Sequence, residues 1–232
     1  MKMNHSRVIA LDGPSGSGKS TIAKEVAKKL SIVYIDTGAM FRAIGLSAHN
    51  AGISFEEGEA LTTFIKNLDL KYGVSNEILI VANGEDLTSK IRDHHVSELA
   101  STISKLPTVR TFLLDFQRSL GNEKTCVMEG RDIGTVVFPN SFCKIFMTAS
   151  NEVRAERRLK QLREQGDNEI QLDQIIEDIQ TRDERDSNRD VAPLKQASDA
   201  ILLDTSSLTF DQVLDSICDT AHSRGKELGI QV

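Results

Sequence analysis

Five short apolar segments predict an α/β fold in which helices cover both faces of a five-stranded parallel sheet. The segments are residues 8–11, 32–35, 126–128, 144–147 and 201–203, and residues with helical spacing separate them. A glycine-rich loop follows the first segment directly. Strand-like residues between 70 and 87 interrupt the alternation of strand and helix, which predicts an inserted small antiparallel β meander.

The glycine-rich loop fits the pattern Gly-x-x-x-x-Gly-Lys-Ser/Thr at every fixed position. It lies between an apolar strand and a stretch with helical spacing, as a P-loop NTPase fold requires. Backbone N–H groups of such a loop, with the N-terminus of the next helix, hold the phosphates of a nucleoside triphosphate. We expect Lys19 to reach the β- and γ-phosphates and the Ser20 hydroxyl to bind Mg²⁺. The predicted phosphate-binding residues are Gly13, Pro14, Ser15, Gly16, Ser17, Gly18, Lys19, Ser20 and Thr21. The alternative is a glycine-rich turn that matches by chance.

The net charge, the apolar runs and the cysteine spacing limit the kinds of molecule that the protein can bind. The chain has 232 residues and a formal net charge of −6, which argues against general affinity for nucleic acid or anionic membranes. No apolar run approaches the length of a membrane span. Cys126, Cys143 and Cys218 are widely spaced and form no metal or redox pair, which indicates a reducing compartment. We expect a cytoplasmic protein whose partners are small molecules.

Local patterns predict the remaining elements. Residues 39–50 and about 55–67 have helical spacing, and residues 70–74 and 78–82 are strand-like, with turns at 75–76 and 83–84. A further helix follows Pro107. The last helix begins with a capping box formed by Thr209 and Gln212. We expect that helix to bury Phe210, Val213, Leu214, Ile217 and Ala221.

Arginines at helical spacing predict a second anion site. Arg154, Arg157 and Arg158 share one helix face, and Arg182, Arg185 and Arg189 share another. Such faces are either solvated and balanced by neighbouring acids or arranged around phosphate. We favour phosphate contact for Arg154, Arg158, Arg182, Arg185 and Arg189, and leave both interpretations open for Arg157 and Arg163. Because the two helices flank a polar turn at residues 164–168, we expect them to form a lid over the phosphates.

Four motifs together resemble the bacterial cytidylate kinase family. They are residues 13–21, residues 36–42 (Asp-Thr-Gly-Ala-Met-Phe-Arg), residues 129–139 beginning Glu-Gly-Arg-Asp, and the pattern Arg182-Asp183-x-Arg185-Asp186-x-x-Arg189 followed by Pro193-Leu194. The likeness runs from about residue 7 to residue 220. It implies an enzyme that phosphorylates CMP and dCMP with ATP and Mg²⁺ and that works as a monomer.

The resemblance also implies roles for individual residues. The acceptor monophosphate would be held by Arg42, Arg131 and Arg189. Arg182 and Asp186 would contact the pentose, and Arg158 and Arg185 would lie along the transferring phosphate; with Lys19, the arginines Arg158, Arg182 and Arg185 form the catalytic set. The cytosine would be read by Thr37, Ser101, Arg110 and Asp132. A carboxylate and an arginine match the amino donor and the two acceptors of cytosine, whereas uracil would set its O4 against Asp132. Without the resemblance, Ser101 and Arg110 read as an exposed serine and a helix-surface arginine.

One position departs from the family, which commonly has Tyr where this chain has Phe41. We expect Phe41 to pack behind Arg42.

The expected organisation is a single kinase domain with mobile parts. Its core comprises about 1–36, 107–153 and 190–232, its acceptor-binding part about 37–106, and its lid about 154–189. Two other functions compete with this one: a kinase of another small acceptor, such as a different nucleoside monophosphate or shikimate, and a nucleotide-dependent switch. The switch lacks support because no Asn-Lys-x-Asp guanine signature is present.

Overall fold

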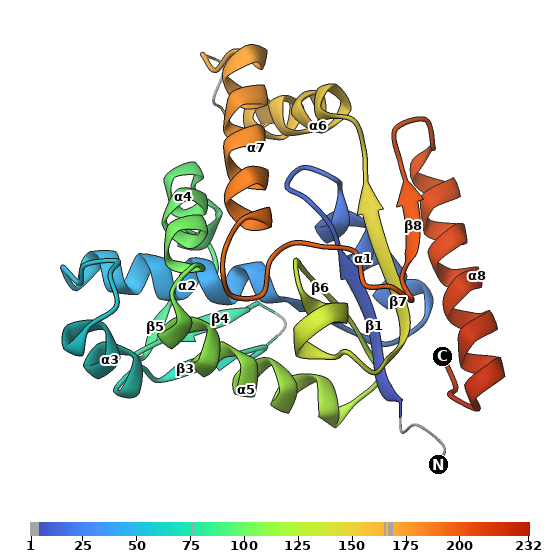
Figure 1. The fold of residues 1–232 in the computed structure, drawn as a ribbon, viewed down its shortest axis with the longest axis horizontal. Helices are drawn as coiled ribbons and strands as arrows, with labels where there is room; N and C mark the ends of the chain where they lie inside the picture. Colours follow the sequence, from blue (N-terminus) through green and yellow to red (C-terminus); the bar gives the residue numbers. More distant parts are fainter. Residues whose placement is uncertain (1–4, 76, 165, 167–168) are drawn as a thin grey trace. The chain divides into compact units, whose positions relative to one another are not determined.

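The computed structural model describes residues 5–75, 77–164, 166 and 169–232. These form two compact units, shown in Figure 1. The larger unit contains the described residues up to Ile35 together with Arg118–Val232, and the smaller unit is Asp36–Gln117. Asn76 of one predicted turn, and residues 165, 167 and 168 of the predicted lid turn, lie outside the described residues.

The larger unit is built on a five-stranded sheet in the order β2-β6-β1-β7-β8. The central strand β1 pairs in parallel with β6 and β7, and β7 pairs in parallel with β8. The prediction of five strands from five apolar segments is therefore confirmed. The strands are β1 (Ser6–Asp12), β2 (Val33–Asp36), β6 (Cys126–Gly130), β7 (Ser141–Thr148) and β8 (Ile201–Asp204).

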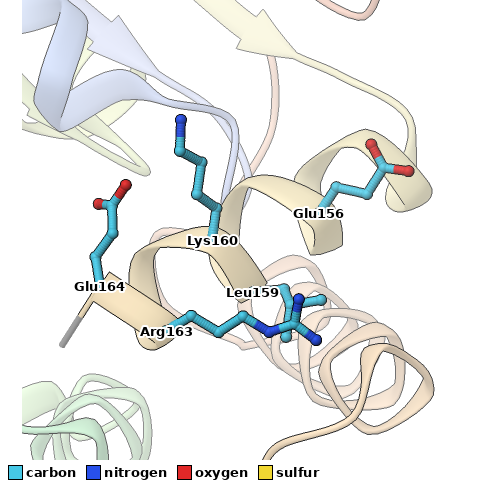
Figure 2. Close-up of a pocket in the computed structure, with 5 residues that line it drawn as sticks. All are labelled: Glu156, Leu159, Lys160, Arg163 and Glu164. Carbon is cyan, nitrogen blue, oxygen red and sulfur yellow. The ribbon is translucent and has the colours of Figure 1, made fainter. Parts of the chain in front are cut away.

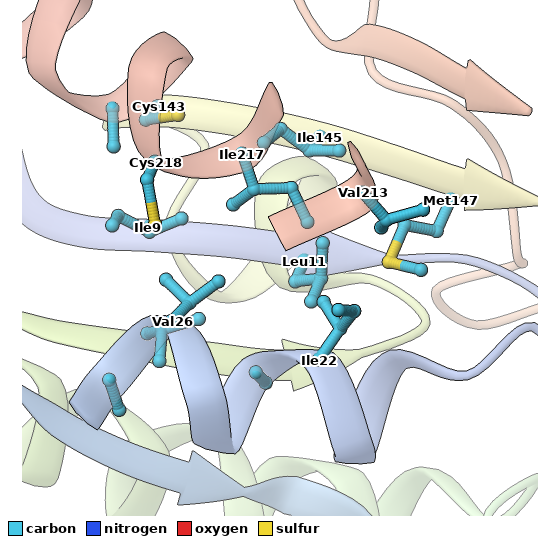
Figure 3. Packing of buried hydrophobic residues seen from close by; sticks show 14 of the residues in the cluster. Ile9, Leu11, Ile22, Val26, Cys143, Ile145, Met147, Val213, Ile217 and Cys218 are labelled. Atoms are coloured by element: carbon cyan, nitrogen blue, oxygen red, sulfur yellow. The ribbon is translucent and has the colours of Figure 1, made fainter. Parts of the chain in front are cut away.

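One face of this sheet packs against α1 (Lys19–Lys29) and α8 (Phe210–Leu228). Figure 3 shows Ile22 and Val26 of α1 and Ile217 of α8 gathered over the strands. The capping box at the start of α8 is confirmed: Thr209 and Gln212 exchange side-chain and backbone hydrogen bonds. The prediction that Phe210 is buried is wrong, because its side chain is 45% exposed. Phe210 is the first residue of the helix, and core packing begins one turn later at Val213.

The other face of the sheet is covered by η2 (Ile133–Val137), a single π-helical turn, and by the last residues of α5 (Pro107–Glu123). Val8 and Ala10, which alternate with the residues of the first face, are fully buried. A Cβ on Gly121 would lie 2.6 Å from a ring carbon of Phe138, so α5 approaches here only because residue 121 is glycine. Burial on both faces is typical of a parallel sheet.

The three cysteines are buried and carry free thiols. Burial raises the pKa of the Cys126 and Cys143 thiols to about 12. They therefore serve as small apolar core residues.

Helices α6 (Asn151–Glu164) and α7 (Leu172–Ser187) pack against each other. Their contact is a small apolar cluster of its own, made by Ala155, Leu162, Ile175 and Ile179. These residues recur at helical spacing on both partners, so each helix turns its charged residues elsewhere.

The smaller unit contains the predicted meander. Its sheet has the order β3-β4-β5 with antiparallel pairing, which confirms the prediction and adds a third, very short strand. The strands are β3 (Leu70–Tyr72), β4 (Ile80–Ala82) and β5 (Glu85–Asp86). The helices are α2 (Thr37–Asn50), α3 (Glu59–Lys66), η1 (Lys90–Arg92), α4 (His94–Ile103) and the first part of α5. Across the described residues, every helix is too short or too polar to cross a bilayer.

The carboxylate of Asp12 connects the end of β1 to η2. Its two oxygens accept hydrogen bonds from the backbone N–H groups of Ile133 and Gly134, at 2.8 and 2.7 Å. Burial raises the pKa of Asp12 to about 6, although these bonds oppose the rise. The side chain is only 5% exposed. Asp12 thus fixes the start of η2, which follows Arg131 and Asp132, beside the residue that opens the glycine-rich loop.

The contrast between Ile217 and Phe210 gives a test of the core. Ile217→Ala should lower the free energy of unfolding by about 2–5 kcal/mol, because it opens a cavity at a fully buried position. Phe210→Ala on the same helix serves as the control and should cost much less. Denaturant unfolding of both variants measures the difference. Equal losses would mean that α8 does not pack as described.

The raised pKa of Asp12 predicts a pH dependence of stability. Between its ordinary value of 3.8 and about 6, the folded protein binds a proton that the unfolded chain releases. Stability from this group is therefore greatest below that window and is lost as the pH rises through about 6. Relative to Asp12→Asn, the wild type should gain up to about 3 kcal/mol between pH 7 and pH 4. Denaturant unfolding across this range measures the gain, with Asp173→Asn, an exposed acid on α7, as the matched control. A difference that does not change with pH would contradict the assignment.

Candidate functional site

The P-loop is shaped by contacts that exclude side chains. Gly13 has φ +150°, and a Cβ there would lie 2.0 Å from the carbonyl oxygen of Met147 in β7. Gly16 and Gly18 also have positive φ, at +74° and +89°, and Gly18 is the N-cap of α1. These conformations turn the loop back on itself at the N-terminus of a helix, which is the arrangement that binds phosphate.

Lys19 is folded onto the loop in this structure. Its ammonium donates to the carbonyl of Pro14 at 2.7 Å and to the hydroxyl of Ser17 at 3.0 Å. The side chain is 5% exposed. Burial first, and then the positive charge of Arg131, lower the pKa of Lys19 well below its ordinary value, while Glu129 and Asp12 oppose the shift. Contact with a phosphate, as predicted from the sequence, therefore requires the ammonium to exchange these oxygens for those of the ligand.

Oxygen groups lie at the start of α1 and where β1 and β6 end. Ser20 is exposed on the first turn of α1, and the carboxylates of Asp12 and Glu129 are buried where β1 and β6 end. Mg²⁺ prefers such oxygens and is usually held together with substrate phosphates. Within the described residues, there is no group of three or more His, Cys, Asp or Glu side chains that could hold a metal ion.

A buried cluster of arginines and carboxylates joins the Glu-Gly-Arg-Asp motif to α7 and the residues after it. Arg131 donates through Nε to Asp186 at 2.9 Å. Arg189 lies 3.5 Å from Asp186 and 3.5 Å from Asp132. Burial alone would raise the pKa of Asp186, but the guanidinium groups of Arg131, Arg182 and Arg189 lower it below its ordinary value. The structure thus brings Arg131, Asp132, Asp186 and Arg189 together.

The remaining arginines of the predicted catalytic set lie on α6 and α7. Arg182 and Arg185 are half-buried on α7, one turn before Asp186 and Arg189. Arg158 is half-buried on α6, and its Nη1 donates to the side chain of Gln161 at 2.9 Å.

The prediction that Arg154 contacts phosphate is not supported by the structure. Arg154 is 4% exposed, and all three of its donor nitrogens bond to protein oxygens. Its acceptors are the backbone of Ala149 and Ser15 and the side chains of Asp183 and Asn151. Its helical spacing with Arg158 could not show that it points into the protein, because the position of the P-loop beside α6 is a tertiary feature.

The two arginines for which both interpretations were open behave differently. Arg157 donates to the hydroxyl and the backbone carbonyl of Thr205, at 3.0 and 2.9 Å, in the segment after β8. Arg163 is exposed and lines an open hollow on α6 (Figure 2). The other residues of that hollow are Glu156, Leu159, Lys160 and Glu164, none of which is a predicted site residue. Arg163 is therefore a surface arginine in this structure.

In the smaller unit, Asp36 positions Arg42. The carboxylate of Asp36 accepts from the backbone of Ala39, as the N-cap of α2, and from Nη2 of Arg42, both at 2.9 Å. The Asp36 N–H donates to the hydroxyl of Tyr72 in the meander at 2.7 Å. The Nε–H of Arg42 is buried and has no hydrogen-bond partner among the described residues. Thr37 is buried at the start of the same helix.

Ser101 and Arg110 are buried, at 3% and 9% exposure, so their reading as surface residues is wrong. Arg110 donates to the carbonyl of Ser104 at 3.1 Å, and its guanidinium lies 5.3 Å from the centre of the Phe41 ring. Phe41 therefore packs against Arg110, a cation–π contact that a phenylalanine makes without the hydroxyl of tyrosine. Local sequence carries no sign of this contact, because 69 positions separate the two residues.

Four acids that sequence reasoning did not assign have clear roles in the structure. Asp12 anchors η2, Asp36 anchors Arg42, and Asp183 accepts hydrogen bonds from the P-loop and Arg154. Glu129 is buried at the end of β6 and accepts from the hydroxyl of Tyr34 at 2.5 Å. Their positions in the sequence could have identified three of them, because Asp12, Asp36 and Glu129 lie where a parallel strand ends. Ligands of α/β proteins bind at these strand ends.

Comparison with known proteins identifies the family to which the chain belongs. A family model described as cytidylate kinase matches residues 9–223. The cytidylate kinase of Exiguobacterium sp. (strain ATCC BAA-1283 / AT1b) is 49% identical, over 93% of this chain and 96% of that protein. The cytidylate kinase of Caldicellulosiruptor saccharolyticus is 45% identical, over 91% and 93% of the two chains. An uncharacterized protein from Eubacterium ventriosum ATCC 27560, solved as a crystal structure, shares the fold with a TM-score of 0.53 and 13% identity, over 93% of this chain and 98% of that one. The family model and these two relatives show that the chain belongs to the cytidylate kinase family.

Proposed function

We propose that the protein transfers the γ-phosphoryl group of ATP to CMP and dCMP, with Mg²⁺, by direct in-line displacement. The observation that carries the proposal is the buried cluster of Arg131, Asp132, Asp186 and Arg189 in the same unit as a P-loop. A P-loop alone accounts for a triphosphate donor. The cluster adds guanidinium groups and carboxylates suited to a second, anionic nucleotide.

The donor would be held by the loop and by Lys19. The N–H groups of residues 13–21 would bind the phosphates, and the Lys19 ammonium would leave the Pro14 carbonyl to bond the β- and γ-phosphates. The Ser20 hydroxyl would hold Mg²⁺, which when bound neutralises phosphate charge. Displacing a carbonyl by phosphate suits Lys19, because a nearby anion favours its charged form.

The acceptor would be held by arginines that now bond to carboxylates. Arg42, Arg131 and Arg189 would bind its phosphate, and Arg182 and Asp186 its pentose hydroxyls. Arg158 and Arg185, on the predicted lid at about 154–189, would stabilise charge on the phosphoryl group in transfer. No residue has to form a covalent intermediate, because in-line transfer depends on position and electrostatics.

The cytosine would be read by Asp132, Arg110, Ser101 and Thr37. All four are buried, which makes an unmatched polar group costly. The Asp132 carboxylate would accept from the exocyclic amino group, and Arg110 would donate to the ring acceptors. Uracil would place a carbonyl against that carboxylate. The proposal includes a role in pyrimidine nucleotide metabolism in the cytoplasm, with the enzyme acting as a monomer.

A panel of acceptors tests the reaction. Coupled detection of ADP release should show turnover with CMP and dCMP at least about 100-fold more efficient than with UMP, AMP or shikimate, because mismatched analogues leave buried polar groups unpaired. Omission of Mg²⁺ serves as the control and should abolish turnover. Equal rates with all acceptors would favour a kinase of another substrate, and nucleotide binding without transfer would favour a switch.

The base-reading role of Asp132 predicts a selective loss. Asp132→Ala should weaken the free energy of CMP binding by about 2–4 kcal/mol, because a buried hydrogen-bonded charge is removed. The free energy of ATP binding should change little. Calorimetric titration with each nucleotide measures both. Asp190→Ala, an exposed acid close to the same cluster in sequence, is the control and should leave both affinities unchanged. Equal losses for CMP and ATP would assign Asp132 a purely structural role.

A further inference from the structure

We propose that Asp183 is an internal anion that competes with the donor phosphate for the P-loop, so that donor binding must release α7 from the loop. This inference rests on the proposed function, in which the loop binds the phosphates of ATP. It assigns a function to an acid that lies between two predicted catalytic arginines and is itself outside the predicted site.

Three groups form a closed hydrogen-bonded ring at the loop. The backbone N–H of Ser15 donates to Oδ1 of Asp183 at 3.1 Å. The backbone carbonyl of Ser15 accepts from Nη1 of Arg154 at 2.7 Å, and the same Nη1 donates to Oδ2 of Asp183. Both polar backbone groups of Ser15 are therefore occupied by one ion pair that links α6 to α7.

The ring is held firmly from the side of α6. Arg154 is 4% exposed and also bonds to Ala149 and Asn151. A Cβ on Gly16 would lie 3.1 Å from both the Cβ and the carbonyl oxygen of Arg154, so the loop and α6 are in close contact. The Asp183 side chain is more accessible, at 19% exposure. Asp183 is consequently the member of the ring that can leave.

Electrostatics make the carboxylate and a donor phosphate mutually exclusive. Backbone N–H groups of a P-loop donate hydrogen bonds to phosphate oxygens. In this structure the Ser15 N–H donates instead to a carboxylate oxygen of Asp183. Two anions near one N–H repel each other strongly at low dielectric. Binding of ATP must therefore break the bond from Ser15 to Asp183.

Release of Asp183 has a consequence for α7. Arg182 and Arg185 flank Asp183 on that helix, and the proposed function places both beside the substrates. Filling the P-loop would thus free the helix segment that carries them. The free energy needed to break the ring lowers the affinity for ATP. The position of α7 then depends on whether the donor is bound.

Asp183→Asn tests the competition, because it removes the charge and nearly keeps the shape. Calorimetric titration with Mg·ATP, in the absence of an acceptor, should show binding about 3- to 10-fold tighter than for the wild type. That range reflects the weaker hydrogen bond that a neutral amide oxygen accepts from the Ser15 N–H and the loss of the repulsion between a carboxylate and the phosphate. Glu184→Gln makes the same change of charge at the next position on α7, where the side chain is exposed, and should leave the affinity unchanged. Circular dichroism and thermal unfolding establish that both variants are folded.

The outcomes separate this inference from the function on which it rests. Wild-type protein that does not bind Mg·ATP would overturn the proposed function and this inference with it. Binding by the wild type with equal or weaker binding by Asp183→Asn would overturn the competition alone.

A measurement on the wild type remains informative if the variant does not fold. Addition of Mg·ATP alone should speed hydrogen exchange in peptides covering residues 179–187, because the ring is broken. Unchanged or slower exchange there would overturn the release of α7.

Discussion

Guanidinium groups gathered in a protein interior repel each other and lose their hydration, and each of the two units has to meet this constraint within itself. Four buried or half-buried arginines are paired with carboxylates: Arg131 and Arg189 with Asp186, Arg42 with Asp36, and Arg154 with Asp183. Such pairing offsets the loss of hydration that an isolated charge would suffer. It also holds the arginines in defined positions, which under the proposed function would orient their donors toward an arriving phosphate.

The parallel sheet decides which charged groups can meet in the larger unit. Because β1 lies between β6 and β7, the P-loop after β1 is adjacent to the Glu-Gly-Arg-Asp motif after β6. Asp12 connects the end of β1 to η2 by accepting hydrogen bonds from two successive backbone N–H groups. Gly13 allows the loop to contact Met147 of β7, because a Cβ at residue 13 would collide with the Met147 carbonyl. The loop is thus positioned by strand order and two local contacts rather than by its own sequence alone.

How far the sequence predicts this structure depends on the distance between interacting residues. The strands, the capping box at Thr209 and the P-loop were predictable because neighbouring residues specify them. The inward direction of Arg154 and the contact of Arg110 with Phe41 were not, because both depend on segments far apart in the chain. Phe210 failed for a related reason: helical spacing gave the correct face of α8 but not the point where that face meets the sheet.

Lys19 shows how the same electrostatics connect the resting structure to phosphoryl transfer. Burial and the charge of Arg131 lower the pKa of Lys19, and its ammonium donates hydrogen bonds to the carbonyl of Pro14 and the hydroxyl of Ser17. Under the proposed function, a triphosphate would bring far more negative charge to the same place and would outcompete a neutral carbonyl for that ammonium. The arginines would exchange their carboxylates for phosphate for the same reason. Under the proposed function, substrate binding is therefore an exchange of internal acceptors for external ones, and the cationic groups that would stabilise the transition state are supplied by the protein itself.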